Sequence, residues 1–287
     1  MLPKFLYYFC LQFNFKELDK STGRPSVSKA DLLKIEMPIP NIEEQARIVS
    51  RIEELFSELD KGVETLQVIK EQLAVYRQAV LKMVFASMNE RKSIQEVSSL
   101  VTSGSRGWAK YYNEKGVRFI RITDLTRDKI KLKNNAIQRV LLPEGVEGKR
   151  SRLQGNDVLI SITADLGSIA LVPEDVEEAY INQHIAVVRF VNSHQGEFMA
   201  WYLKSDYGQK ELLCNKRGGG KLGLGLDDIR NTSVPIVSDE VADEVVSEIE
   251  SRMSVCDSIE QTVNVALSQA EAMRQSILKK ALEGGLN

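Results

Sequence analysis

Basic and polar side chains that could contact a nucleic acid gather in about fifty residues of this 287-residue chain. Between 102 and 152 there are 13 basic and 5 acidic residues, a local charge of +8, although the whole chain has a net charge of -2. Arginine and lysine supply donors to guanine edges and charge to phosphates. The stretch therefore predicts contact with a polyanion. A solvated basic surface without a partner is the alternative that charge alone leaves open.

The first candidates lie in a short polar loop and in the basic and aromatic residues that follow it. Serine hydroxyls and backbone N–H groups suit phosphate contacts, and an arginine can donate two hydrogen bonds to guanine. Trp108 could instead belong to the core. The candidates here are Ser103, Ser105, Arg106, Trp108, Lys110 and Tyr111.

Further candidates lie at the ends of predicted strands. Side-chain amides there can match the hydrogen-bonding edges of adenine or cytosine. The turn 161–167 could instead only shape a hairpin, and a lone His184 is more often a hydrogen-bonded strand residue than a base. Arg118 and Arg121 are three apart and so point to opposite faces of a strand, which leaves one of them for DNA. The candidates are Arg121, Thr123, Asp124, Arg150, Arg152, Thr163, Asn182, Gln183 and His184.

A glycine-rich segment adds the basic candidates Lys216, Arg217 and Lys221. It is not a nucleotide-binding loop, because Asn215 replaces the first glycine of that motif and Leu222 replaces its hydroxyl residue. The glycines also follow a predicted helix rather than a strand, which excludes the dinucleotide-binding motif. They could let the backbone approach a phosphate chain closely, or they could merely form a loop.

Motifs for catalysis or metal binding are missing from the sequence. Neither HExxH nor GxSxG occurs, and Cys10, Cys214 and Cys256 form no CxxC pair, so they are expected to be small buried groups. We expect no catalysis by this chain and no bound cofactor or metal. The apolar stretch Phe5 to Phe13 is too short to cross a bilayer, which predicts a cytoplasmic chain without a membrane partner.

An internal repeat shows which elements must position these residues. At an offset of 197 and without a gap, Pro38-Ile39 returns as Pro235-Ile236, and Arg77-Gln78 returns as Arg274-Gln275. Residues 1–90 thus repeat as 198–287, whereas 91–197 occur once.

Both repeat cores are predicted to be long helices. Apolar residues recur every seven positions, which is typical of a coiled-coil seam, and the second seam has the smaller residues, so the two helices can interdigitate. Asn41 and Ser238 cap their starts. Gly62 lies on the seam and marks a bend, a close approach or only a loss of helix propensity. The proposed interface residues are Ile52, Leu59, Leu66, Leu73, Val80, Ile249, Val263, Ala270 and Ile277.

The middle of the chain changes from helical to strand periodicity. Strands are predicted over 117–122, 157–162, 169–172 and 185–190, and helices over 93–100 and 196–213. The fold class is therefore α+β, with a globular domain between two long helices.

The sequence as a whole resembles the specificity (S) subunit of Type I restriction-modification systems. The resemblance rests on Pro38–Val49 with the following Glu-Glu-Leu-Phe, on Asp157–Gly167 and on Ile181–His184, and it covers essentially the whole chain. It implies a non-catalytic subunit in which a target recognition domain reads half of a bipartite double-stranded DNA site. Antiparallel helices would set the gap between the halves and dock modification (M) subunits.

The same resemblance divides the chain and assigns the chemistry to partners. Residues 38–90 and 236–287 would be spacer helices, 91–235 a complete recognition domain, and 1–37 the tail of another recognition domain. S-adenosylmethionine would bind to the M subunit, which methylates adenine, and ATP and magnesium to the restriction (R) subunit.

Family members carry two complete recognition domains, so this chain is expected to lack the front of its first one. The missing part could come from another S fragment, or two copies of this chain could pair and read a symmetric site. A different function is an interaction scaffold that docks M subunits without reading DNA. A nuclease or methyltransferase in its own right lacks any supporting motif.

Overall fold

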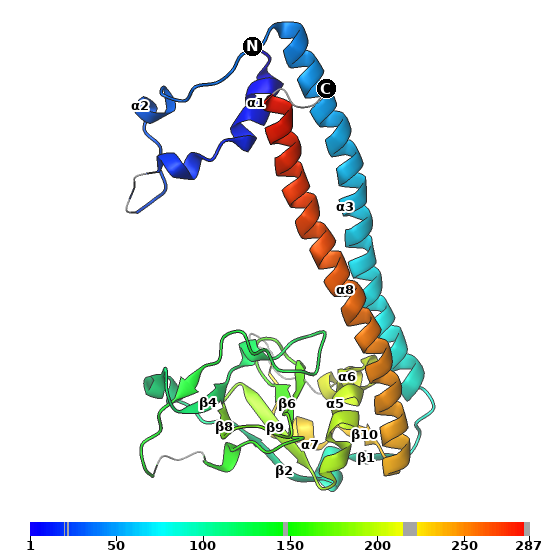
Figure 1. The fold of residues 1–287 in the computed structure, drawn as a ribbon. Helices are drawn as coiled ribbons and strands as arrows, with labels where there is room; N and C mark the ends of the chain where they lie inside the picture. The colour runs from blue at the N-terminus through cyan, green and yellow to red at the C-terminus, as the bar shows by residue number, and fades with distance from the viewer. Residues whose placement is uncertain (20, 22, 146–148, 215–222, 284–287) are drawn as a thin grey trace. The chain divides into compact units, whose positions relative to one another are not determined.

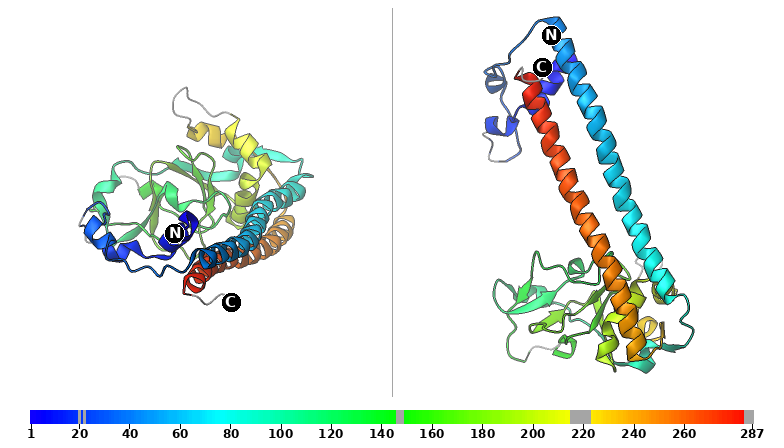
Figure 2. Two further views of the ribbon diagram at one scale, coloured as in Figure 1. Left: turned by 90° about the horizontal axis from the view of Figure 1, so that it is seen from above. Right: turned by 45° about the vertical axis from the view of Figure 1, so that its right-hand side comes forward.

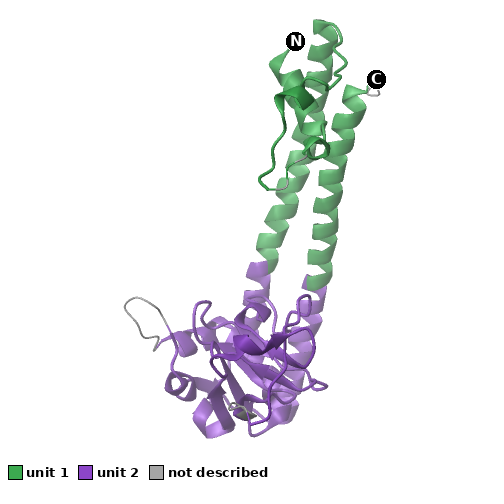
Figure 3. Cartoon of the chain, turned by 90° about the vertical axis from the view of Figure 1, so that its left-hand side faces the viewer, with its two compact units in different colours: residues 1–73, 257–287 green, residues 74–256 purple. Residues whose placement is uncertain are grey.

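The computed structural model describes residues 1–19, 21, 23–145, 149–214 and 223–283. The chain forms two compact units (Figure 3), residues 1–73 with 257–287 and residues 74–256, called unit 1 and unit 2 below. Both long helices, α3 (Ile42–Phe85) and α8 (Asp239–Leu282), contribute to each unit.

In unit 1, the short helix α1 (Pro3–Gln12) packs on parts of the two long helices. The other elements of this unit are η1 (Phe15–Leu18) and α2 (Lys29–Leu32). Asn41 caps α3 as expected, since its Oδ1 accepts a hydrogen bond from Glu44 N at 2.8 Å. Ile52 near the start of α3 shares a core with Leu278 near the end of α8, so the helices run antiparallel here (Figure 2).

The heptad seam is only partly as predicted. Its first apolar positions are buried or half-buried, namely Ile52, Leu59, Leu66, Leu73, Val263, Ala270 and Ile277 in unit 1 and Val80 and Ile249 in unit 2. A coiled-coil seam also needs apolar residues buried three positions further along each heptad, but Tyr76, Met83, Ile259 and Met273, which lie at such positions, are exposed. The buried stripe on each long helix is therefore narrower than the full seam of a coiled coil.

The described residues of unit 2 form three small sheets, in the orders β1-β10, β2-β9-β6-β7 and β3-β5-β4-β8. The strands are β1 (Arg91–Ser93), β2 (Ser98–Ser103), β3 (Tyr112–Asn113), β4 (Val117–Ile120), β5 (Arg139–Val140), β6 (Val158–Ser161), β7 (Ile169–Leu171), β8 (Ala179–Ile181), β9 (Ile185–Phe190) and β10 (Ser233–Pro235). The helices are α4 (Ile94–Val97), η2 (Trp108–Tyr111), η3 (Ile122–Asp124), η4 (Lys149–Ser151), η5 (Ser193–Gln195), α5 (Gly196–Lys204), α6 (Asp206–Leu213) and α7 (Leu226–Arg230).

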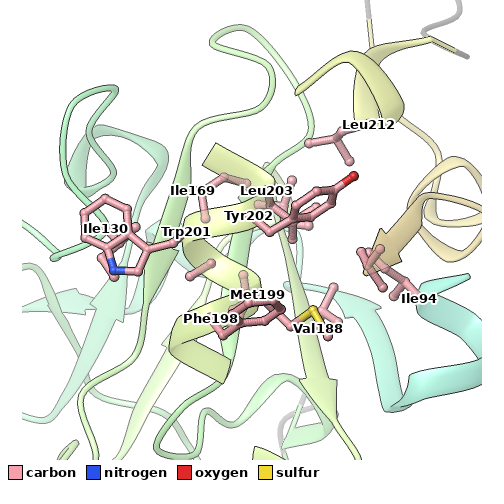
Figure 4. Close-up of a cluster of buried hydrophobic side chains, with 14 of the residues drawn as sticks. Ile94, Ile130, Ile169, Val188, Phe198, Met199, Trp201, Tyr202, Leu203 and Leu212 are labelled. Atoms are coloured by element: carbon pink, nitrogen blue, oxygen red, sulfur yellow. The ribbon is translucent and has the colours of Figure 1, made fainter. Parts of the chain in front are cut away.

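The central sheet of unit 2 is apolar on both faces, because successive side chains of its strands enter different cores. Val158 and Ile160 of β6 pack in the larger core with α5, whereas Leu159 between them packs in the second core. Helix α5 lies beside this sheet (Figure 1), and its Phe198, Trp201 and neighbours fill the larger core (Figure 4).

Two of the predicted helices need correction. The helix predicted over 93–100 stops at Val97, and 98–103 form β2, which pairs antiparallel with β9. The N-terminal cap of this helix is present, since Glu96 accepts a hydrogen bond from Ser93 N at 2.8 Å. The helix nevertheless ends early, because the following residues pair with the distant strand β9. The helix over 196–213 breaks at Ser205, whose Oγ accepts a hydrogen bond from Gly208 N and caps α6.

The expectation that all three cysteines are buried is wrong, because Cys10 and Cys214 are exposed and Cys256 alone is buried. Within the described part of the chain, none of the helices combines the length and the apolar character needed to cross a bilayer.

Candidate nucleic-acid interface

A cleft of about 1270 Å³ in unit 2 collects many of the residues selected from the sequence. The predicted residues that line it are Ser103, Ser105, Arg106, Trp108, Lys110, Tyr111, Arg150, Thr163 and Gln183. They come from four separate parts of the chain: the end of β2 with η2, η4, the turn after β6 and the turn before β9. Tertiary folding therefore joins candidates that the sequence offered as independent segments.

One wall of the cleft is held by direct contact between backbones. Gly104 N donates a hydrogen bond to Ile185 O at 3.2 Å, and Ser105 forms a bridge with Asn182. A Cβ atom at Gly104 would collide with the carbonyl oxygens of Ile181 and Asn182. Only glycine therefore lets the 103–108 loop lie this close to the 181–183 turn.

Trp108 anchors this loop rather than projecting from it. The residue is only 4% exposed, and its ring lies 5.2 Å from that of Tyr180 and 5.7 Å from that of Phe119. Gly107, with φ at +75°, makes the turn that places the indole in this aromatic core. Trp108 therefore belongs to a hydrophobic core, which was the alternative to DNA contact, although the residue also lines the cleft.

Three basic residues of the cleft are exposed, namely Arg106, Lys110 and Arg150. None of them forms an ion pair with another residue in the ranges that the structure describes. Lys110 Nζ lies 4.9 Å from the centre of the Tyr111 ring, which leaves its charge at the surface. These three cations are available to phosphate groups.

Other arginines of the basic region form ion pairs with carboxylate groups of unit 2. Arg139 pairs with Glu177 at 2.9 Å, and Arg127 pairs with Asp165. These partners hold the pKa of both carboxyl groups below its usual range, chiefly through the hydrogen bonds from the guanidinium groups. Part of the local basic charge is therefore taken up in ion pairs within unit 2, whereas Arg106, Lys110 and Arg150 in the cleft have no such partner among the described residues.

The polar side of the cleft carries a short chain of hydrogen bonds. Thr163 Oγ1 lies 2.7 Å from His184 Nδ1, and Gln183 Nε2 lies 3.0 Å from His184 Nε2. Both ring nitrogens of His184 are thus engaged in hydrogen bonds, as expected, but the residue lies in the turn before β9 rather than in a strand. The turn after β6 is fixed separately, since Ser168 Oγ donates to Asp165 Oδ2 at 2.7 Å.

Several predicted residues lie outside the cleft lining, namely Arg121, Thr123, Asp124, Arg152, Asn182 and His184. Asp124 is 8% exposed, and its Oδ2 accepts a hydrogen bond from Arg121 N at 2.8 Å, so it fixes the η3 turn. Arg121 Nη2 in turn donates to Ala136 O. Lys216, Arg217 and Lys221 fall outside the described residues.

Sequence reasoning missed six lining residues, most of them small or apolar: Gly104, Gly107, Gly145, Ile162, Leu224 and Leu226. Leu224 reaches the cleft because its N–H donates to Ile162 O at 3.1 Å, a pairing that has no local sequence signal. In the described ranges, no cluster of three or more His, Cys, Asp or Glu side chains is suited to hold a metal ion.

Comparisons with known proteins agree with the resemblance found in the sequence. The family model described as Type I restriction modification DNA specificity domain matches residues 1–71 and 90–269. The Type I restriction enzyme EcoBI specificity subunit of Escherichia coli is 25% identical over 316 residues, with 99% of this chain and 66% of that protein covered. The StySPI specificity subunit of Salmonella potsdam is also 25% identical, with 88% of this chain and 58% of that protein covered. The chain thus spans less than two thirds of the length of these two relatives.

Solved structures show the same fold. A chain from a study of complex assembly and conformational transition of the type I R-M system superposes with a TM-score of 0.78 at 20% identity, covering 99% of this chain and 72% of that one. The HsdS subunit from Thermoanaerobacter tengcongensis gives a TM-score of 0.55 at 20% identity, covering all of this chain and 71% of that one.

Proposed function

This chain belongs to the family of Type I restriction-modification DNA specificity domains, and from that premise we propose that it reads a double-stranded DNA sequence through the cleft of unit 2. The observation that carries the proposal is the cleft itself, where Arg106, Lys110 and Arg150 have no acidic partner among the described residues and hydroxyl and amide side chains line the same surface. Specificity subunits of Type I systems are non-catalytic, so the family confirms the expectation of a chain without catalysis.

The two kinds of group have different tasks in this proposal. The cations contact phosphates and position the domain, because phosphate contacts carry no sequence information directly. Thr163 and Gln183 lie where base edges can be read by hydrogen bonding. Arg106 can serve either task, since a guanidinium also matches a guanine edge.

We extend the proposal to the remaining parts of the chain, with the resemblance to the family as support. We assign residues 91–235 to target recognition, 38–90 and 236–287 to spacing and to docking of M subunits, and 1–37 to the tail of another recognition domain. S-adenosylmethionine on the M subunit and ATP with magnesium on the R subunit then supply methylation and restriction. A cytoplasmic location remains a prediction.

A binding assay with matched variants tests the DNA-reading function. The protein, together with its M subunit, should enrich one sequence from a random duplex pool, and R106A, K110A and R150A should each weaken binding to the recovered duplex. Arg47→Ala is the control, because it removes an exposed charge on α3 far along the chain from the cleft residues. Equal binding to recovered and scrambled duplexes would contradict the proposal.

A scaffold is the second candidate function, and exposed apolar side chains on the long helices favour it. In unit 2, Val75, Met83 and Val255 are all exposed. A scaffold that only docks M subunits keeps this docking and shows no DNA preference, in the wild type as well as in R106A. Substitution of these three residues by serine should release the M subunit under either function.

The number of copies in the complex is a separate question. One copy has a mass of 32.3 kDa. If two copies pair to read a symmetric site, light scattering gives twice this mass and the recovered DNA motif is a palindrome. A bipartite asymmetric motif points instead to another S fragment.

A further inference from the structure

The hydrogen-bonded chain Thr163–His184–Gln183 fixes which atoms the cleft presents. Gln183 and Thr163 line the cleft, whereas His184, which contacts both, is not among the lining residues. The turn that carries them is tied down as well, because Asn182 Oδ1 accepts a hydrogen bond from His184 N at 3.2 Å. The imidazole is therefore held in place between a hydroxyl and an amide.

The two hydrogen bonds are donated in the same direction, from Gln183 to His184 and from His184 to Thr163. The amide nitrogen Nε2 of Gln183 can only donate, so His184 Nε2 accepts. A neutral imidazole then carries its proton on Nδ1 and donates it to Thr163 Oγ1. Rotating the amide by half a turn would set its oxygen against His184 Nε2, and the chain would then need the opposite tautomer, with Nε2–H donating to Gln183 and Nδ1 accepting from the Thr163 hydroxyl.

One N–H and the Oε1 atom of Gln183 remain for a ligand. Within the described part of the chain, neither has a hydrogen-bond partner. A donor and an acceptor side by side match adenine, which offers the N7 acceptor and the N6 amino donor in the major groove. Guanine offers two acceptors there, so it would place an oxygen against Oε1.

Resting on the proposed DNA-reading function, we infer that Gln183 reads an adenine and that His184, held by Thr163, is the positioning residue that orients its amide. The pairing sets one base of the recognised sequence. It makes the side chains of this turn a determinant of specificity rather than of affinity alone.

Selection from a random duplex pool tests the reading role. The wild type should recover adenine at one position, and Q183A should lose that preference by roughly 5- to 150-fold while the rest of the motif stays. Q183E should shift the preference toward cytosine, because a carboxylate accepts a hydrogen bond from the cytosine N4 amino group. Gln154→Ala, an exposed glutamine of unit 2 outside the cleft, is the control that leaves the motif unchanged.

The outcomes separate the two proposals. If Q183A weakens binding to all duplexes equally and keeps the motif, Gln183 contacts a phosphate and the inference is overturned, while the DNA-reading function stands. If the wild type recovers no motif at all, the DNA-reading function itself fails.

Nitrogen NMR of labelled histidine tests the positioning role. The chain has two histidines, His184 and His194, so His194→Gln assigns both signals. His184 should show the Nδ1–H tautomer, and T163S should keep both tautomer and adenine preference, whereas T163V should reduce both. A predominant Nε2–H tautomer in the wild type reverses the polarity of the chain and overturns the inference.

Discussion

At the residue scale, Gly104 determines whether the cleft wall can form. An alanine there would force two backbone segments apart, and overpacking of this kind costs about 1–3 kcal/mol. Gly62 on α3 is the matched control, because a Cβ atom there meets nothing within 4 Å. The seam glycine is thus no close approach, and its replacement should gain helix propensity.

We expect Gly104→Ala to lower the free energy of unfolding by about 1–3 kcal/mol and Gly62→Ala to raise it by about 0.5–1 kcal/mol. Urea unfolding followed by circular dichroism measures both. A neutral result at Gly104 would mean that the 103–108 loop does not lie on the 181–183 turn.

Lys204 is the second residue with a measurable consequence. It is 5% exposed, its Nζ donates hydrogen bonds to Thr126 O and Lys129 O, and burial lowers its pKa from 10.5 to about 8. Between these two pKa values the unfolded chain binds more protons than the folded one, so stability rises with pH.

The free energy of unfolding of the wild type should therefore increase from pH 8 to pH 10, relative to Lys204→Met, by about 2 kcal/mol. Chemical unfolding of both proteins at several pH values gives this difference. A difference that stays constant across the window would show that the ammonium group is solvated.

At the scale of elements, the internal repeat places equivalent residues in different surroundings. Leu203 of α5 is fully buried in the core of unit 2, whereas its repeat counterpart Leu6 of α1 is 39% exposed. Helix α5 packs on the central sheet and also on Phe85 of α3, through Phe198 and Tyr202. Helix α1 packs in the smaller core of unit 1, which is formed largely by side chains of α3 and α8.

Truncation at these two positions should reflect the difference. Leu203→Ala should cost about 2–5 kcal/mol because it leaves a cavity in a packed core. Leu6→Ala should cost less than about 1 kcal/mol, since much of its side chain is already in water. Thermal unfolding of both variants checks this, and equal losses would mean that α1 is covered in solution.

At the scale of the whole molecule, charge is segregated rather than balanced. The net charge of -2 hides +5 over residues 91–235 and -6 over 236–287. Electrostatic attraction to DNA therefore depends on local cations, and each phosphate contact releases counterions.

Affinity for DNA should fall steeply as salt rises, and each of R106A, K110A and R150A should reduce the slope of log K against log salt by about 0.9 if its cation contacts a phosphate. Titrations at four salt concentrations measure the slopes. Arg139→Ala is the informative comparison, because its guanidinium is already paired with Glu177 and its loss should leave the slope unchanged.

Helices and apolar strands were predictable because their signals are local. The cap at Asn41 directly precedes α3 and the apolar spacing lies within it, and β9 begins with the continuous apolar run Ile185–Val188. The first three residues of β2, 98–100, were mistaken for helix because the partner strand β9 lies about 85 residues further along the chain. The shortest strands, such as β3 and β5, have too few residues to show a period.

The amino-acid sequence by itself determined the repeat, the two long helices, the α+β middle and the family, since these depend on patterns along the chain. Only the tertiary structure decided which basic residues are free. Arg139 and Glu177 are 38 residues apart, yet they neutralise each other, whereas Arg106 and Arg150 meet in one cleft without an acidic partner among the described residues. Whether a charge is available to DNA depends on what folding brings within a few ångströms of it.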